Sequence, residues 1–371
     1  MPGMDLIEDR PLHEAISRLL AQWLPGARIV SVSALTESRP ERGDGAAKFL
    51  GYGSSLRVEV ETAEGMHRKL VFRTSRTDDF GHDRRADRAA DALLAFDTFP
   101  RIPGHVAALD VGAIDGSGEL VSLRGAGEFY TVTDYVEGTP YAEDLWRIAE
   151  RGELEAEDLR RCDALADWLV GLHAEKLPGR GVYRRAIRDL IGHGEGIFGL
   201  VDNFPDDVPG IPLERLRALE RRSADWRYRL RGRERRLSRT HGDFHPFNIL
   251  FGPQGELRLL DASRGCAGDP ADDVACLAVN YVFFALEHEG SWDGAFAPLW
   301  SRFWERYLNE TRDEELLEAA PPFLAWRILV LTNPLWYPNA SKRTREALLG
   351  LAERALEAGR LEQRYAEELF D

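Results

Sequence analysis

The sequence HGDFHPFNILF occupies residues 241–251, and a second short segment, LLD, follows it at residues 259–261. Asn248 comes five residues after Asp243, and Asp261 comes thirteen residues after Asn248. Residues 248–251 and 256–260 have strand patterns on either side of a turn at residues 252–255, which predicts a short β-hairpin. The hairpin would bring the three oxygen-bearing side chains to one site, and oxygen ligands suit a hard cation such as Mg²⁺.

The first third of the chain has mainly strand patterns. Alternating and β-branched residues predict strands of an antiparallel sheet at residues 28–33, 56–61, 69–74, 106–111 and 129–135. Residues 83–96 differ, because Ala86, Ala90, Leu93 and Leu94 recur at helical spacing. This part of the chain is therefore predicted to be a small sheet with one helix.

From about residue 140 onward the patterns are helical. Residues 157–173 and 341–361 each carry one apolar stripe at spacings of three and four. Strands followed by helices favour an α+β chain with two lobes, which we divide into residues 1–138 and 139–371.

Composition restricts the class of protein. The 371 residues carry a formal net charge of −15, so neither a nucleic acid nor an anionic membrane is the expected partner. Cys162, Cys266 and Cys276 form no Cys-x-x-Cys pair, so neither a disulfide framework nor a cysteine zinc site is indicated. No signal-peptide pattern is visible, and the longest apolar run, residues 275–286, is too short to span a bilayer. We therefore expect a cytoplasmic protein, whose oligomeric state is left open.

Several segments together resemble one enzyme family. They are His-Gly-Asp-x-x-x-x-Asn at residues 241–248, Asp261, Gly-Asp-Pro-Ala-Asp-Asp-Val-Ala at residues 268–275 and Leu-Val-Gly-Leu-His at residues 169–173. The chain, over roughly residues 45–280, resembles the aminoglycoside phosphotransferase and choline kinase family, relatives of protein kinases. The resemblance implies an α+β, protein-kinase-like bilobal fold, with a small antiparallel-sheet N-lobe containing one helix and a larger, mainly helical C-lobe.

The resemblance also implies an activity. It is the ATP- and Mg²⁺-dependent transfer of a γ-phosphoryl group to a hydroxyl of a small molecule, such as an aminoglycoside, an amino alcohol or a sugar. Asp243 would be the catalytic carboxylate, and Asn248 and Asp261 would be the magnesium ligands. Asp273 would brace the backbone of the catalytic loop. The nucleotide would bind residues 1–138, and the catalytic and acceptor-binding residues would lie in 139–371.

The phosphates are expected to lie at a glycine turn that contains Gly51, Gly53 and Ser54, although an ordinary hairpin turn has the same sequence pattern. Family members carry a lysine on the next strand and a glutamate on the next helix. The aligned residues here are Arg73 and Asp87, which would keep a bidentate pair.

Two further predictions concern the nucleotide. Lys69 is an alternative to Arg73 as the residue that binds the phosphates. Asp134, Tyr135 and Val136 belong to the predicted hinge, residues 133–138, whose backbone would bind the adenine. Whether ATP or GTP is the donor stays open.

Three other interpretations were weighed. The unusual Arg73 and Asp87 suggest a catalytically impaired, nucleotide-binding scaffold protein. A protein kinase is disfavoured, because Asp-Ala-Ser stands at residues 261–263 instead of Asp-Phe-Gly. His241 and His245 have the spacing of a zinc helix, but the following Gly242 and Pro246 oppose a continuous helix.

The last two features are an arginine-rich segment and a group of aromatic residues. Residues 214–239 hold eleven arginines, which predict a solvated helix face, with an anionic acceptor or partner as the alternative. The aromatic residues of the C-terminal part are expected to be mostly core.

Overall fold

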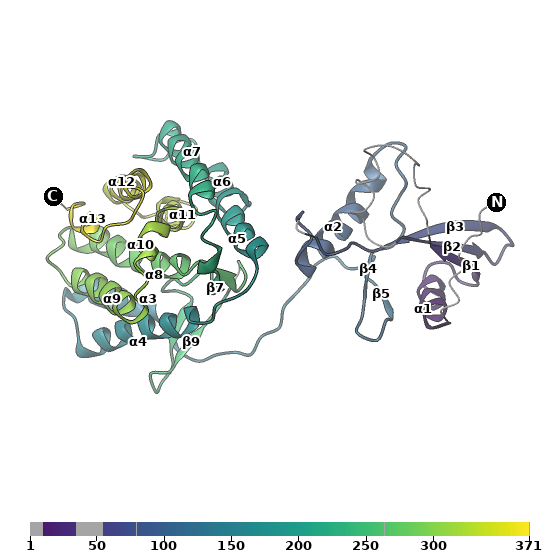
Figure 1. Ribbon diagram of the computed structural model, residues 1–371, viewed down its shortest axis with the longest axis horizontal. Helices are drawn as coiled ribbons and strands as arrows, with labels where there is room; N and C mark the ends of the chain where they lie inside the picture. Colours follow the sequence, from purple (N-terminus) through teal and green to yellow (C-terminus); the bar gives the residue numbers. More distant parts are fainter. Residues whose placement is uncertain (1–9, 35–54, 79, 263, 371) are drawn as a thin grey trace. The chain divides into compact units, whose positions relative to one another are not determined.

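The computed structural model describes residues 10–34, 55–78, 80–262 and 264–370. The chain separates into two compact units, Met1–Thr133 and Asp134–Asp371 (Figure 1). Both strands and helices are present in the first unit, and the second is mainly helical, so the α+β class is confirmed.

The first unit is built on a three-stranded antiparallel sheet with the order β1-β2-β3. The strands are β1 Arg28–Ala34, β2 Ser55–Glu61 and β3 His67–Arg73. Val58 in the central strand lies opposite Val32 on one side and Leu70 on the other, and all three are buried. This register places one apolar face of the sheet in the core of the unit, as period-two alternation requires.

A helix that the sequence patterns did not predict covers this face. It is α1, Arg10–Ala21, whose Ile16 and Leu20 are buried in the same cluster as Val58 (Figure 1). The prediction of a single helix in this part of the chain was therefore wrong. The signal was present in the sequence, because Leu12, Ile16 and Leu20 recur at a spacing of four.

The remainder of the first unit confirms one prediction and corrects two. The predicted helix is present as α2, Arg85–Thr98, which continues into the 3₁₀ turn η2, Phe99–Arg101. The only other strands in the described part of this unit are β4, Gly112–Ile114, and β5, Leu120–Ser122, which pair with each other. Residues 106–111 and 129–135 therefore form no strand, and the two predictions were wrong. Alternation shows that a segment is suited to a half-buried strand, but a strand also needs a neighbouring strand with which it forms hydrogen bonds.

The second unit is a group of helices with short strands between them. In chain order it contains β6 Thr139–Pro140, α3 Tyr141–Arg151, α4 Ala156–His173, α5 Arg180–Gly192, α6 Ile197–Asp202, α7 Leu213–Arg229, η3 Glu234–Arg236, β7 Ser238–Arg239, β8 Ile249–Phe251, β9 Leu257–Leu259, β10 Ala267–Gly268, α8 Ala271–Phe284, η4 Ala285–Glu289, α9 Phe296–Thr311, α10 Glu315–Ala319, α11 Pro321–Thr332, α12 Lys342–Ala358 and α13 Arg364–Glu367. The predicted hairpin is confirmed, because β8 pairs with β9 and Ile249 lies opposite Leu259.

The core of this unit forms around α8, which packs against α9 and α11 (Figure 1). All residues of α8 except Asp272 are buried, which explains the long apolar run in the sequence. A helix that is apolar on every side belongs inside a protein or a membrane. No helix in the described ranges is both long and apolar enough to cross a membrane.

The buried position of α8 leads to a stability prediction. Leu277→Ala should lower the free energy of unfolding by about 2–5 kcal/mol, because Leu277 is fully buried and the variant leaves a cavity. Leu213→Ala, at an exposed position, is the matched control and should change it by less than about 0.5 kcal/mol. Urea unfolding followed by tryptophan fluorescence measures both, and equal effects would contradict the core assignment.

Candidate active site

The loop between β7 and β8 is held by a buried carboxylate. Asp273, in the first turn of α8, accepts hydrogen bonds of 2.8 Å from the backbone N–H groups of both His241 and Gly242. Gly242 has a φ of +84°, and a Cβ at this position would lie 3.0 Å from the carbonyl oxygen of Gly265. The loop therefore needs glycine here, and the prediction that Asp273 braces the loop backbone is confirmed.

The same carboxylate joins α8 to two other helices. His173 at the end of α4 places Nε2 3.1 Å from Asp273 Oδ2, and its Nδ1 lies 2.7 Å from the hydroxyl of Tyr307 in α9. Burial is the largest effect on the pKa of Asp273 and acts to raise it. The hydrogen bonds and charge of His173 and the two backbone N–H groups together outweigh burial, so the pKa lies below its ordinary value.

Asn248 connects the loop to the hairpin. Its Nδ2 lies 3.1 Å from the carbonyl oxygen of Asp243, 3.3 Å from Asp243 Oδ2 and 3.5 Å from the carbonyl oxygen of Asp261. The backbone N–H of Leu260 donates to the carbonyl oxygen of Asn248, which fixes the start of the hairpin to its end. The structure thus brings Asp243, Asn248 and Asp261 together, and it leaves Asn248 Oδ1 as the atom suited to a cation.

Asp261 has an unusual backbone conformation. Its φ is 44°, in the left-handed region that Asp and Asn tolerate better than other side chains. The side chain is exposed, and no partner of its carboxylate is found among the described residues. The carboxylate is therefore accessible to a ligand.

Asp243 lies in a charged and mostly buried environment. Its side chain is 18% exposed, Arg327 Nη1 lies 3.8 Å from Oδ1, and His245 Nε2 lies 3.4 Å from Oδ2. Burial is the largest effect on the pKa of Asp243 and acts to raise it, but His245 and the charges of Arg327 and Arg264 lower it below the ordinary value. The same burial lowers the pKa of His245. Asp243 is therefore ionised at neutral pH.

Arg264 fixes the loop from the other side. Its Nε donates a 2.7 Å hydrogen bond to the carbonyl oxygen of Gly242, and Nη2 donates to Asp272 at 2.6 Å. The guanidinium stands 3.7 Å from the centre of the Trp326 ring, a cation–π contact. The peptide between Gly242 and Asp243 is thus held through its carbonyl oxygen, while the preceding N–H groups are held by Asp273.

Comparison with known proteins places this site in a family. The model of the phosphotransferase enzyme family, APH, matches residues 46–312, which is more than half of the chain. The chain belongs to this family. As the sequence resemblance implied, the protein is a small-molecule kinase.

Solved structures with similarity to this chain include enzymes for different acceptors. Aminoglycoside-3'-phosphotransferase of type VIII is 18% identical, the match covers 86% of this chain and 100% of that one, and the TM-score is 0.33. A glucosamine kinase is 14% identical, with 92% and 93% covered and a TM-score of 0.37. An ethanolamine kinase from Plasmodium vivax is 13% identical, with 95% and 94% covered and a TM-score of 0.36. These values are low, so membership rests on the family model. Curated protein sequences gave no match.

Arg264 and Arg327 were not among the site residues predicted from the sequence. Arg264 follows Asp261 by three residues, so its closeness in sequence to a predicted metal ligand was a signal that it belongs to the site. Arg327 is the one charged residue of α11, PPFLAWRILVLT, and a charge within an apolar helix requires a buried partner. Which partner it meets is decided only by the packing of α11 against the loop.

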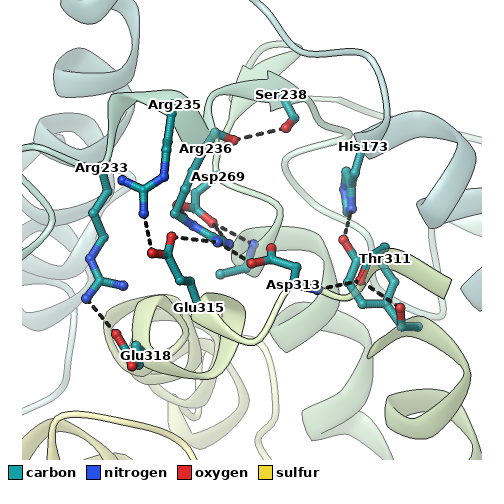
Figure 2. A network of polar contacts seen from close by, with 12 residues as sticks. His173, Arg233, Arg235, Arg236, Ser238, Asp269, Thr311, Asp313, Glu315 and Glu318 are labelled. Carbon is teal, nitrogen blue, oxygen red and sulfur yellow. Dashed lines mark hydrogen bonds and ion pairs between the residues drawn. The ribbon is translucent and has the colours of Figure 1, made fainter. Parts of the chain in front are cut away.

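The arginine-rich segment divides into two parts. Along α7 the arginines at 217, 221, 222, 227 and 229 are exposed, as predicted for a solvated helix face. The prediction was wrong for Arg215, which is half-buried and pairs with Glu353, for Arg233, which is half-buried and pairs with Glu318, and for Arg236, which is buried. Arg235 pairs with Glu315 and stays exposed (Figure 2).

Arg236 is the centre of a buried ionic network. It donates to Asp269 through Nε at 2.9 Å and Nη2 at 3.0 Å, and its Nη1 lies 2.6 Å from Asp313 (Figure 2). The hydroxyl of Tyr183 also donates to Asp269 at 2.8 Å. These contacts anchor the chain on both sides of the loop, because Arg236 precedes it and Asp269 follows Asp261.

The structure describes only some of the phosphate-binding residues that were predicted in the first unit. Gly51, Gly53 and Ser54 lie outside the described residues. Arg73 ends β3 opposite Ser55 and is exposed, and Asp87 Oδ2 accepts a 2.8 Å hydrogen bond from the backbone N–H of Arg84 at the start of α2. The pairing of Arg73 with Asp87 stays a prediction.

The predicted hinge residues lie at the start of the second unit. Asp134, Tyr135 and Val136 belong to an irregular segment that precedes β6, and Tyr135 is 90% exposed. Their backbone groups form no helix or strand, so the assignment of the hinge to adenine stays a prediction.

The pKa of Asp273 leads to a prediction about acid stability. The lowered pKa means that its ionised form stabilises the folded state above about pH 4, and that this contribution is lost as the pH falls further. Asp273→Asn should therefore cost about 3–5 kcal/mol near pH 7, since it removes a buried carboxylate that accepts two backbone N–H groups and contacts His173. The cost should become smaller in urea unfolding below about pH 4.

The neighbouring Asp272 provides the control. Its side chain is 12% exposed, and this partial burial raises its pKa to about 7, so the wild type loses stability as the pH rises from about 4 to about 7. The stability of Asp272→Asn relative to the wild type should increase over that range, in which the cost of Asp273→Asn stays constant. The same pH dependence in both variants would contradict the assignment of Asp273.

Proposed function

We propose that this phosphotransferase transfers the γ-phosphoryl group of ATP to a hydroxyl of a small molecule, with Asp243 as the catalytic carboxylate. The observation that carries the proposal is the contact of the Asn248 side chain with both Asp243 and Asp261. Asn248 Nδ2 lies 3.3 Å from Asp243 Oδ2 and 3.5 Å from the backbone carbonyl oxygen of Asp261. This closeness supports a site in which Asp243 would orient the hydroxyl while Asn248 and Asp261 would hold a metal.

Asp243 would act mainly by orientation. An ionised carboxylate whose pKa is below its ordinary value is a weak base, so it accepts a hydrogen bond from the acceptor hydroxyl and takes the proton late in the transfer. Phosphoryl transfer needs little covalent help from the protein, and alignment of the hydroxyl with the phosphorus contributes most of the acceleration.

The residues present fit magnesium. Asn248 Oδ1 and the carboxylate of Asp261 would hold the ion, and the described residues contain no group of three His, Cys, Asp or Glu that holds a metal by itself. A site with few protein ligands suits Mg²⁺, which usually keeps waters and substrate phosphates as its other ligands. When bound, the ion supplies positive charge that neutralises the phosphate oxygens.

The nucleotide side of the proposal rests on family membership. Residues 1–138 would bind ATP, with Gly51, Gly53 and Ser54 at the phosphates, Arg73 and Asp87 in place of the lysine and glutamate, and Asp134, Tyr135 and Val136 at the adenine. Residues 139–371 would carry the catalytic residues and the acceptor.

A second candidate function is favoured by one observation. The Asp87 carboxylate accepts a hydrogen bond from the backbone N–H of Arg84 at the start of its own helix, and Arg73 and Asp87 replace the lysine and glutamate of the family, as expected for a catalytically impaired nucleotide-binding scaffold. Against it, Asp243, Asn248 and Asp261 are all present and adjacent. Nucleotide binding and turnover therefore have to be measured separately.

The first measurement is a thermal-shift titration with MgATP, MgGTP and each nucleotide without metal. At one hundred times its Kd a ligand stabilises the folded protein by about 2.7 kcal/mol, which raises the melting temperature by a few degrees. We expect a metal-dependent shift that is lost in Asp261→Ala. An identical shift in wild type and Asp261→Ala would remove Asp261 from the metal site.

The second measurement is turnover. Release of ADP from MgATP would be followed with choline, ethanolamine, glucosamine and an aminoglycoside as acceptors. Asp243→Asn should lower the rate about 10²–10⁴-fold and keep the MgATP thermal shift, because the amide cannot accept the proton. Unchanged turnover in Asp243→Asn would exclude the proposed role, and nucleotide binding without turnover in the wild type would favour the scaffold.

A further inference from the structure

Arg327 is a buried arginine with few hydrogen bonds. It lies on α11, where 3% of its surface is exposed, and its neighbours along the helix are apolar. Burial of a charge in such surroundings is unfavourable unless an opposite charge lies close by. The partner of this guanidinium therefore explains its presence.

The guanidinium has one charged partner among the described residues, which is Asp243. Nη1 lies 3.8 Å from Asp243 Oδ1, Nη2 donates a long 3.4 Å hydrogen bond to the hydroxyl of Tyr337, and Nε has no hydrogen-bond partner. Arg345, also buried and nearby in sequence, differs from it. Arg345 donates to the carbonyl oxygens of Thr332, Tyr337 and Pro338, as an arginine with a structural role does.

The two oxygens of Asp243 lie in different environments. Oδ1 is buried, has no hydrogen-bond partner among the described residues and faces Arg327. Oδ2 faces Asn248 and His245. Since Oδ1 has almost no accessible surface, a molecule that binds this carboxylate from the solvent would have to contact it through Oδ2.

We propose that Arg327 is a positioning residue for Asp243. Its positive charge attracts Oδ1 into the protein, which fixes the carboxylate plane and presents Oδ2 to the acceptor hydroxyl beside Asn248. The inference rests on the proposed function, because it assumes that Asp243 orients the acceptor. The proposal gives α11, a helix outside the catalytic motif, a direct part in the geometry of the reaction.

The test compares Arg327→Gln, Arg327→Lys and the control Arg345→Gln. ADP release is measured at saturating MgATP with the best acceptor among choline, ethanolamine, glucosamine and an aminoglycoside, or with water if none reacts. Arg327→Gln should lower kcat about 100-fold and leave the KM for MgATP within about threefold, because misplacement of a reacting group by about 1 Å has an effect of this size. Arg327→Lys keeps the charge, so its kcat should be at least about tenfold higher than that of Arg327→Gln.

Arg345→Gln separates positioning from general destabilisation. It should lower the melting temperature and leave kcat within about threefold of the wild type, because Arg345 contacts the backbone and not Asp243. Three results would overturn the proposal: a kcat of Arg327→Gln within threefold of the wild type, an equal loss of kcat in Arg345→Gln, or no recovery in Arg327→Lys.

A double variant covers the case in which Arg327→Gln does not fold. Asp243→Asn removes the charge that Arg327 balances, so Asp243→Asn/Arg327→Gln should melt at a higher temperature than Arg327→Gln alone. A double variant that is no more stable would overturn the pairing of the two charges. A wild type that releases no ADP and shows no MgATP shift would be a failure of the proposed function, and the melting temperatures would still test the pairing.

Discussion

The carboxylate of Asp273 is the interaction on which the site depends. It accepts two backbone N–H groups of the loop and contacts His173, so a single buried group fixes α4, α8 and the loop to one another. Its position in the first turn of α8 is favourable, because the positive end of the helix dipole attracts a negative charge. Without it, two buried donors would have no partner, and such donors are costly.

Three other acids around the loop follow a common arrangement, in which each has an arginine from a separate element. Asp269 pairs with Arg236 before the loop, Asp272 with Arg264 after the hairpin, and Asp243 with Arg327 on α11. Removing one member of a buried pair costs more than the pair contributes, because the other charge is left unbalanced. The loop is therefore held through charges that constrain one another.

The sequence predicted best those features that depend on neighbours along the chain. The hairpin of β8 and β9, the helix α4 and the bracing role of Asp273 follow from local spacing or from a motif. The strands expected at residues 106–111 and 129–135 were wrong, since a strand depends on a partner that its own pattern does not specify. Arg327 was missed for the same reason, because it meets Asp243 through packing of segments that lie 84 residues apart.

The backbone of Asp261 restricts which residues this position accepts. A φ of 44° is readily adopted by Gly, Asn and Asp, and of these only Asp provides a carboxylate. Glutamate has the same charge, but residues other than Gly, Asn and Asp adopt this conformation less readily. An inactive relative that conserves the turn would therefore carry Asn or Gly here. Asn or Gly at this position would mark a family member that has lost a metal ligand, and any other residue in place of Asp would mark a member whose loop has changed shape.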